Sequence, residues 1–144
     1  MASRAASGKD KPAIVAQDPD TLAQYVPDLQ EWPASWRVED EDIPPGQAIV
    51  AIFTPFLEHL LTLGYARKTL LRHRDHLWML GGEIIRRRYE HPDVLAMPVV
   101  TLLHNLIEED GGPLIWPRIS ESEQNSFDAT CRKLYHYLNR SRNA

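Results

Sequence analysis

The sequence predicts an all-α fold, a bundle of four main helices preceded by an irregular and partly disordered N-terminal arm. Apolar residues recur at spacings of three and four in four segments, which is the period of helices that bury one face. Glycine or proline residues separate these segments, and no segment alternates apolar and polar residues as a half-buried strand does. A chain of 144 residues, 43% of them hydrophobic, is long enough to enclose one core.

The N-terminal part of the chain divides into two segments of different composition. Residues 1–20 are rich in Ala, Ser, Lys, Asp and Pro, and we expect them to be disordered. Residues 21–45 form an acidic arm rich in Trp and Pro, where the prolines restrict helix to about one turn. Trp32 and Trp36 indicate that this arm wraps onto the body and buries its rings, and the alternative is that the rings bind a protein partner. We expect the acidic run at 39–42 to be a solvated linker.

The first predicted helix extends from about Gly46 to Leu63. Its apolar positions recur at helical spacing, but Pro55 lies inside the pattern. Because proline removes a backbone hydrogen bond, either the helix kinks there or a second segment begins with Pro55 at its first position. Gly64 is expected to end the helix with a positive φ, which glycine adopts without a Cβ clash.

The second predicted helix begins near Arg67 and ends at His91-Pro92. Gly81 and Gly82 lie inside it, and each costs about 1 kcal/mol relative to alanine. The pair therefore indicates either the close approach of a neighbouring helix or a bend. The buried stripe of this helix consists of Leu70, His73, Leu77, Leu80 and Ile84.

Two further helices complete a folded domain over residues 46–140, and 141–144 are a C-terminal tail. Pro98 opens the third helix, whose apolar stripe extends to Ile107, and the glycines and proline at 111–113 stop it. Ser120 and Glu123 have the spacing of a capping box, which predicts a last helix from Glu121 to about Asn139. Its apolar stripe contains Phe127, Cys131, Leu134 and Leu138.

Bulk properties exclude several classes of protein. Cys131 is the single cysteine, so neither an intramolecular disulfide framework nor a cysteine zinc cage is possible. No apolar run approaches the 18 or so residues that a membrane span requires, and the N-terminus lacks the apolar core of a signal peptide. We expect a soluble, cytoplasmic protein with no membrane partner.

The sequence contains no credible catalytic constellation. It lacks the nucleophile-elbow, phosphate-loop and dinucleotide-binding motifs. His73, Asp75 and His76 form an H-x-D-H group on the second helix, but zinc needs three or four converging ligands and no H-E-x-x-H motif accompanies them. A metal-dependent helical enzyme is therefore the weakest interpretation, and we expect no enzymatic activity, no cofactor and no metal.

Charge is distributed unevenly along the chain, although the net charge is −4. Residues 64–90 contain seven basic and three acidic residues, whereas 91–117 contain four acidic and no basic residues. Phosphate contacts need Lys and Arg on a rigid face, so the basic helices are candidates for binding double-stranded DNA. The alternative is that these charges only keep the protein soluble. The candidate DNA-binding residues are Arg67, Lys68, Thr69, Arg72, Arg74, Arg132 and Lys133.

Two stretches of the chain resemble the core-binding (SAM-like N-terminal) domain of tyrosine recombinases, the phage-integrase family. They are FLEHLL at 56–61 followed by GYARKTL at 64–70 with Leu77, and the ending formed by Phe127, Arg132, Leu134, Tyr135, Tyr137 and Leu138. The resemblance covers about residues 46–140. Ala66 stands where the family often has a capping Ser, and we expect the family's catalytic domain to be absent.

The resemblance implies a four-helix SAM-like bundle that clamps DNA, with its second and fourth helices nearest the duplex. Our expectation is a non-catalytic DNA-binding module, accessory to a mobile element or integrase and partnered by a recombinase or another protein. The alternative is a protein-interaction subunit or regulator of a larger assembly that does not contact DNA, for which Trp32 and Trp36 are the candidate contact residues.

Overall fold

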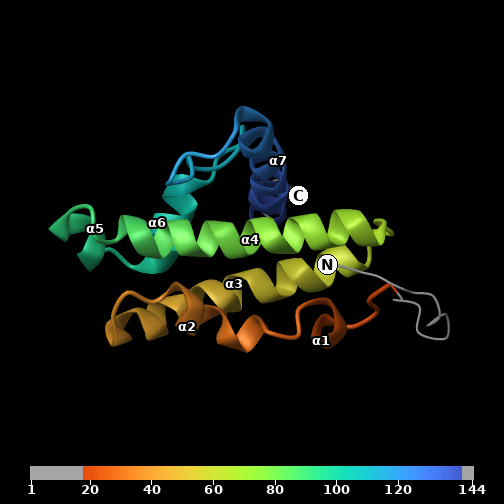
Figure 1. Cartoon of the computed structure of the whole chain (residues 1–144), viewed down its shortest axis with the longest axis horizontal. Helices are drawn as coiled ribbons and strands as arrows, with labels where there is room; N and C mark the ends of the chain where they lie inside the picture. The colour runs from red at the N-terminus through yellow and green to blue at the C-terminus, as the bar shows by residue number, and fades with distance from the viewer. Residues whose placement is uncertain (1–17, 141–144) are drawn as a thin grey trace, which may run out of the picture.

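The computed structural model describes residues 18–140 and confirms the all-α prediction (Figure 1). These residues form seven α-helices and two short 3₁₀-helices, α1 to α7 and η1 to η2 in chain order. The described part contains no strand, only one isolated bridge between Glu108 and Gly111. Most of the disordered segment predicted for 1–20, and the whole tail at 141–144, lie outside the described residues. None of the helices formed by 18–140 is long and apolar enough to cross a membrane.

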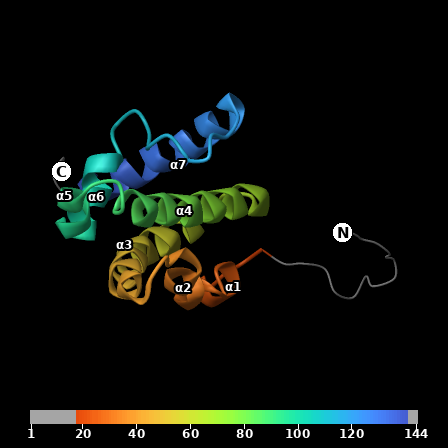
Figure 2. The same cartoon turned by 60° about the vertical axis from the view of Figure 1, so that its left-hand side comes forward.

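The two longest central helices pair through a glycine turn. α3 (Ile43–Leu61) and α4 (Arg67–Arg87) lie side by side, with Gly64 at φ 74° in the connection, as predicted. In both views, α3 and the N-terminal arm cover one side of α4, while α6 (Val99–Leu106) and α7 (Glu121–Asn139) cover the other (Figures 1 and 2). α4 is therefore the central element of the bundle.

α3 begins three residues before the predicted start and passes through Pro55 without breaking. Prolines at its N-terminus are tolerated because the first backbone N–H groups of a helix have no partner within the helix. At Pro55 the ring faces solvent, and the Thr54 hydroxyl donates to the Val50 carbonyl at 2.7 Å. The interpretation that a second segment starts at Pro55 is therefore wrong: the helix is one continuous element from Ile43 to Leu61.

Gly81 and Gly82 mark a close contact between α4 and the arm. A Cβ built on Gly81 would lie 2.2 Å from Cζ2 of Trp36, so only glycine fits beneath this ring. The indole Nε1 of Trp36 donates to the Trp78 carbonyl at 3.0 Å. The close-approach interpretation is confirmed at Gly81, although the neighbour is an indole ring rather than a helix backbone.

The arm is more helical than its prolines suggested, and it is part of the core. It contains α1 (Leu22–Tyr25), η1 (Leu29–Glu31), α2 (Trp32–Trp36) and η2 (Asp40–Asp42). Pro33 is tolerated because it lies in the first turn of α2. Trp32 is 3% exposed and Trp36 7%, so the prediction that the arm anchors itself by burying its rings is confirmed.

The prediction that 39–42 is a solvated linker is wrong at its last residue. Asp42 is 1% exposed, and its carboxylate accepts hydrogen bonds from the backbone N–H groups of Val38 and Glu39 at 2.8 and 2.9 Å. It also forms an ion pair with Arg88 at 2.8 Å and accepts from the Tyr89 hydroxyl at 2.7 Å. This carboxylate fastens the arm to the end of α4.

The C-terminal half follows the sequence prediction closely. α6 and α7 have the predicted positions, and Ser120 and Glu123 form the capping box at the start of α7. Phe127, Cys131 and Leu134 are buried, as expected for its apolar stripe. A further short helix, α5 (Pro92–Ala96), was not predicted, because no residue in it is buried and so no apolar stripe marks it.

A basic and aromatic pocket beside the DNA-binding candidates

The basic residues predicted on the second helix divide between two sides of α4. Arg67 and Arg74 are half-buried toward the arm, where they line a small cavity of about 180 Å³ with Asp18 and Gln24. Arg74 also donates to the Tyr25 carbonyl and pairs with Asp75 at 3.0 Å. The arm therefore partly covers the side chains of both arginines.

Lys68, Thr69 and Arg72 do not line the cavity beside the arm. Lys68 and Arg72 are exposed, and Thr69 is half-buried. Lys68 and Arg72 are four residues apart, so they are neighbours on one helix face. Within residues 18–140, neither has a carboxylate within ion-pair distance.

The basic residues predicted on the last helix also separate. Arg132 donates to the Asp110 carbonyl at 3.0 Å, on the side of α7 that faces the preceding loop. Lys133 instead lies toward α3 and α4, with its ammonium 5.4 Å from the centre of the Tyr65 ring. The Tyr65 ring also packs against His73, with the ring centres 5.6 Å apart, and Arg72 directly precedes His73 on α4. We call Lys68, Thr69, Arg72 and Lys133 the basic face.

A pocket of about 320 Å³ adjoins the basic face between the C-terminal half of α3, the glycine turn and the last turns of α7. Phe56, Leu60 and Leu63 give it apolar walls. Its remaining lining residues are aromatic or carry nitrogen, and no carboxylate is among them. They are His59, Tyr65, Lys133, His136, Tyr137 and Arg140. We call this cavity the basic pocket.

Aromatic rings hold the cations at the rim of the basic pocket. The Arg140 guanidinium lies 3.8 Å from the centre of the Tyr137 ring, and Lys133 lies over Tyr65 as described. Tyr137 packs in turn against Phe56 and His59, at centroid distances of 5.3 and 4.9 Å. None of the carboxylates in 18–140 forms an ion pair with Lys133 or Arg140. Arg140 also donates a hydrogen bond to the Tyr137 carbonyl, so within residues 18–140 the rim carries two cations that no carboxylate neutralises.

A pair of histidines beneath the basic face shares one hydroxyl. The Nδ1 atoms of His73 and His76 each lie 2.7 Å from Oγ1 of Thr130, which joins α4 to α7. A hydroxyl has one hydrogen, so at least one of these Nδ1 atoms must be protonated and donate to it. Burial, aided by the charges of Lys133, His76 and Arg72, lowers the pKa of His73 to about 4.

These contacts bear on the metal interpretation of the H-x-D-H group. His73 and His76 converge on Thr130, whereas Asp75 pairs with Arg74 on the exposed side of the helix. Over residues 18–140, no three His, Cys, Asp or Glu side chains converge in an arrangement that would hold a metal ion. The structure therefore does not bring the three residues of this group together.

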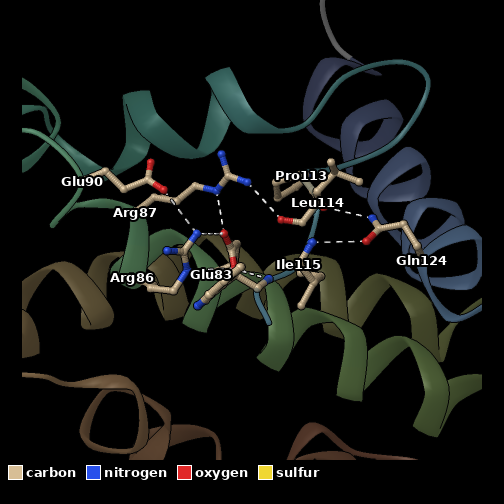
Figure 3. Close-up of polar contacts among 9 residues, drawn as sticks. Glu83, Arg86, Arg87, Glu90, Pro113, Leu114, Ile115 and Gln124 are labelled. Atoms are coloured by element: carbon tan, nitrogen blue, oxygen red, sulfur yellow. Dashed lines mark hydrogen bonds and ion pairs between the residues drawn. The ribbon is translucent and has the colours of Figure 1, made fainter. Parts of the chain in front are cut away.

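The arginine run at the end of α4 is used within the fold. Glu83 is buried, and it pairs with Arg86 at 2.7 Å and Arg87 at 2.6 Å (Figure 3). Its other oxygen accepts the backbone N–H of Trp116 at 3.2 Å, and Arg87 also donates to the Leu114 carbonyl. These contacts hold the loop at 113–116 against α4.

From the other side, α7 holds the same loop. Gln124 donates to the Pro113 carbonyl at 3.0 Å and accepts the backbone N–H of Ile115 at 3.2 Å (Figure 3). Trp116, which ends this loop segment, is 66% exposed, and Trp78 on α4 is 43% exposed. Both rings line one hollow of about 230 Å³ with Met79 and Ile115. The exposed tryptophans are thus this pair, whereas the predicted contact residues Trp32 and Trp36 belong to the core.

Sequence reasoning assigned no role to His59 and His136, which line the basic pocket. A signal was present on the last helix, because Lys133, His136, Tyr137 and Arg140 recur at spacings of three and four and so share one face. His59 had no such signal, since only the fold brings α3 beside α7. Comparison of the chain with protein-family models, curated proteins and solved structures gave no match.

Proposed function

We propose that the protein is a non-catalytic DNA-binding module whose basic face contacts the phosphates of a duplex. The observation that carries the proposal is that Lys133 of α7 lies over Tyr65, whose ring packs on His73, the residue that follows Arg72 on α4. Within residues 18–140, neither Arg72 nor Lys133 forms an ion pair with a carboxylate. Phosphate binding needs such cations, because each neutralised phosphate releases counterions that were condensed on the DNA.

The rigidity of this surface supports the proposal. α4 and α7 pack against each other, and the shared hydroxyl of Thr130 ties them together directly beneath the basic face. Cations on two locked helices keep a fixed spacing, which orients a protein on the duplex. A role accessory to a mobile element or integrase, with a recombinase as protein partner, belongs to the same proposal and rests on the resemblance of 46–140 to core-binding domains.

A salt titration of duplex binding tests this function. Fluorescence anisotropy with a labelled duplex should give binding at low salt, and the affinity should fall steeply as salt is raised. The combined variant Lys68→Ala, Arg72→Ala and Lys133→Ala should lower both the affinity and the salt slope, by about one slope unit for each phosphate that is no longer neutralised. The matched control is Arg118→Ala, which removes an exposed cation in the loop before α7. Undetectable binding at low salt, or equal decreases in both variants, would contradict the proposal.

A second candidate function is protein–protein association through the hollow between Trp78 and Trp116. Exposed large apolar side chains that gather on one surface favour such contacts, and Leu114 beside Trp116 is 75% exposed. The occupant that we propose is a second copy of this chain, because one copy can offer both the hollow and the protruding Leu114. Sedimentation velocity over a hundredfold concentration range should show a dimer that Trp116→Ser abolishes. A monomer at all concentrations would contradict this candidate.

A further inference from the structure

We infer that the basic pocket binds one nucleotide that carries a terminal phosphate monoester. The inference rests on the proposed DNA-binding function where it concerns strand ends, because the pocket adjoins the basic face and shares Lys133 with it. The argument for a nucleotide ligand uses only the size, walls and cations of the pocket, so it does not depend on duplex binding.

The size of the pocket selects a small ligand. A cavity of about 320 Å³ lies at the lower end of small-molecule sites, so it accommodates one nucleotide and not a duplex. Its walls also suit a planar, weakly polar group. Phe56, Leu60 and Leu63 offer apolar surface, and bases pack favourably against such walls and against aromatic rings.

The charge of the pocket selects the phosphate. Lys133 on α7 and Arg140 at its C-cap lie two helical turns apart at the rim, and the imidazoles of His59 and His136 add further nitrogen donors or acceptors. A monoester carries up to two negative charges and three terminal oxygens, so it can satisfy several of these groups at once. A diester within a strand carries one charge and has two flanking sugars that the pocket cannot enclose.

Ring contacts hold both cations in place before a ligand arrives. Arg140 lies on the Tyr137 face and Lys133 over Tyr65, so each loses less side-chain freedom on binding than an unsupported cation would. Since no carboxylate lines the pocket, an incoming phosphate displaces no internal ion pair. Two sources share this chemistry, namely a free nucleoside monophosphate and the 5′-phosphate at the end of a DNA strand.

Calorimetric titration of the full chain tests the nucleotide site. Deoxyadenosine monophosphate should bind with an affinity at least tenfold above those of deoxyadenosine and of inorganic phosphate, because neither half-ligand uses both the walls and the rim. Arg140→Ala should weaken its binding about tenfold, the effect of removing a charge-assisted hydrogen bond. Leu63→Trp should block the pocket at its half-exposed rim without removing a cation. Arg118→Ala, which removes an exposed cation outside both the pocket and the basic face, should leave nucleotide binding unchanged. Equal affinity for the nucleotide and inorganic phosphate would overturn the inference.

Duplex binding separates this inference from the proposed function. If strand ends are the ligand, a duplex with 5′-phosphates should bind more tightly than the same duplex with 5′-hydroxyls, and Leu63→Trp should remove the difference. Nucleotide binding without any preference for 5′-phosphates would support the site and overturn the strand-end source. Duplex binding that depends on Arg72 while the nucleotide fails to bind would overturn the site and leave the proposed function standing. Absence of both kinds of binding would overturn both.

Discussion

Trp36 lies directly on Gly81, so that a single methyl group at position 81 would meet Cζ2 of the indole at 2.2 Å. The neighbouring Gly82 is different, because a Cβ there would lie 3.4 Å from Cδ1 of the same ring, which is an ordinary contact. One glycine is therefore required by packing, and the other is a helix-weakening residue with room for a side chain.

Gly81→Ala should lower the free energy of unfolding by about 1–3 kcal/mol, the usual cost of forcing extra volume into a packed core. Gly82→Ala should be neutral or raise that free energy by up to about 1 kcal/mol, because alanine favours the helix more than glycine does. Urea unfolding followed by circular dichroism measures both. Equal destabilisation by the two substitutions would mean that the ring does not decide the effect.

Asp42 provides the second prediction, because its carboxylate connects the arm to the end of α4. Burial raises the pKa of Asp42, but hydrogen bonds from Glu39, Tyr89 and Val38 together with the charge of Arg88 outweigh burial and hold the pKa below its ordinary value. The stabilisation is therefore present above pH 4 or so and is lost as the pH falls through the lowered pKa.

Asp42→Asn should lower the free energy of unfolding by about 3–5 kcal/mol at pH 7, since it leaves the largely buried Arg88 without its partner. The matched control is Asp40→Asn. Asp40 is exposed and pairs with the half-exposed Arg37, so its substitution should cost less than about 1 kcal/mol. Urea unfolding at pH 7 measures both variants. A similar small cost for each would show that the arm is not held through Asp42.

Glu83 provides the third prediction, because two arginines and a loop amide share its carboxylate. Glu83→Ala should lower the free energy of unfolding by about 2–4 kcal/mol. This is less than the usual cost of leaving a buried charge without its partner, because Arg86 and Arg87 can turn toward water. The loop should loosen as well, so hydrogen exchange at the Trp116 amide should accelerate. Glu90→Ala, which removes only a longer and exposed pair with Arg86, should leave both measurements nearly unchanged.

The helices were predictable from the sequence where local signals are strong. The capping box at Ser120 and the stripe through Phe127 located α7, and Gly64 located the turn after α3. The single helical turn predicted near Leu22–Leu29 is confirmed by α1. The start of α3 and the later helical segments of the arm were missed, because prolines were counted as breakers although a helix tolerates them in its first turn. Glycine turns and capping residues thus located helix boundaries well, whereas helices that begin with proline were placed too late or missed.

Partners across the fold could not be predicted in the same way. Periodicity shows which face of a helix is apolar. It does not show which other part of the fold covers the polar residues on either side of that face. Arg67 and Arg74 were therefore grouped with Arg72, although the arm covers only the first two. The burial of Asp42 was equally hidden, since its partner Arg88 is 46 residues away. Pairings at this distance come only from the assembled bundle.

The histidine pair beneath the basic face provides the last prediction, a loss of stability between neutral and mildly acidic pH. Burial, followed by the charges of Lys133, His76 and Arg72, lowers the pKa of His73 from 6.5 to about 4. The unfolded chain therefore binds a proton in this range that the folded chain refuses, and the free energy of unfolding should fall as the pH drops. One such group gives a slope of up to about 1.4 kcal/mol per pH unit.

Urea unfolding at pH 7, 6, 5 and 4.5 measures this slope, and the window lies above the range in which Asp42 titrates. His73→Leu should flatten the dependence, because leucine has no proton to exclude. His104→Ala, which alters an exposed histidine on α6, should keep the wild-type slope. His76 adds to the slope, because burial and the charge of Arg72 lower its pKa as well, so some dependence should remain after His73→Leu. An unchanged slope in that variant would show that His73 is not the group whose protonation opposes folding.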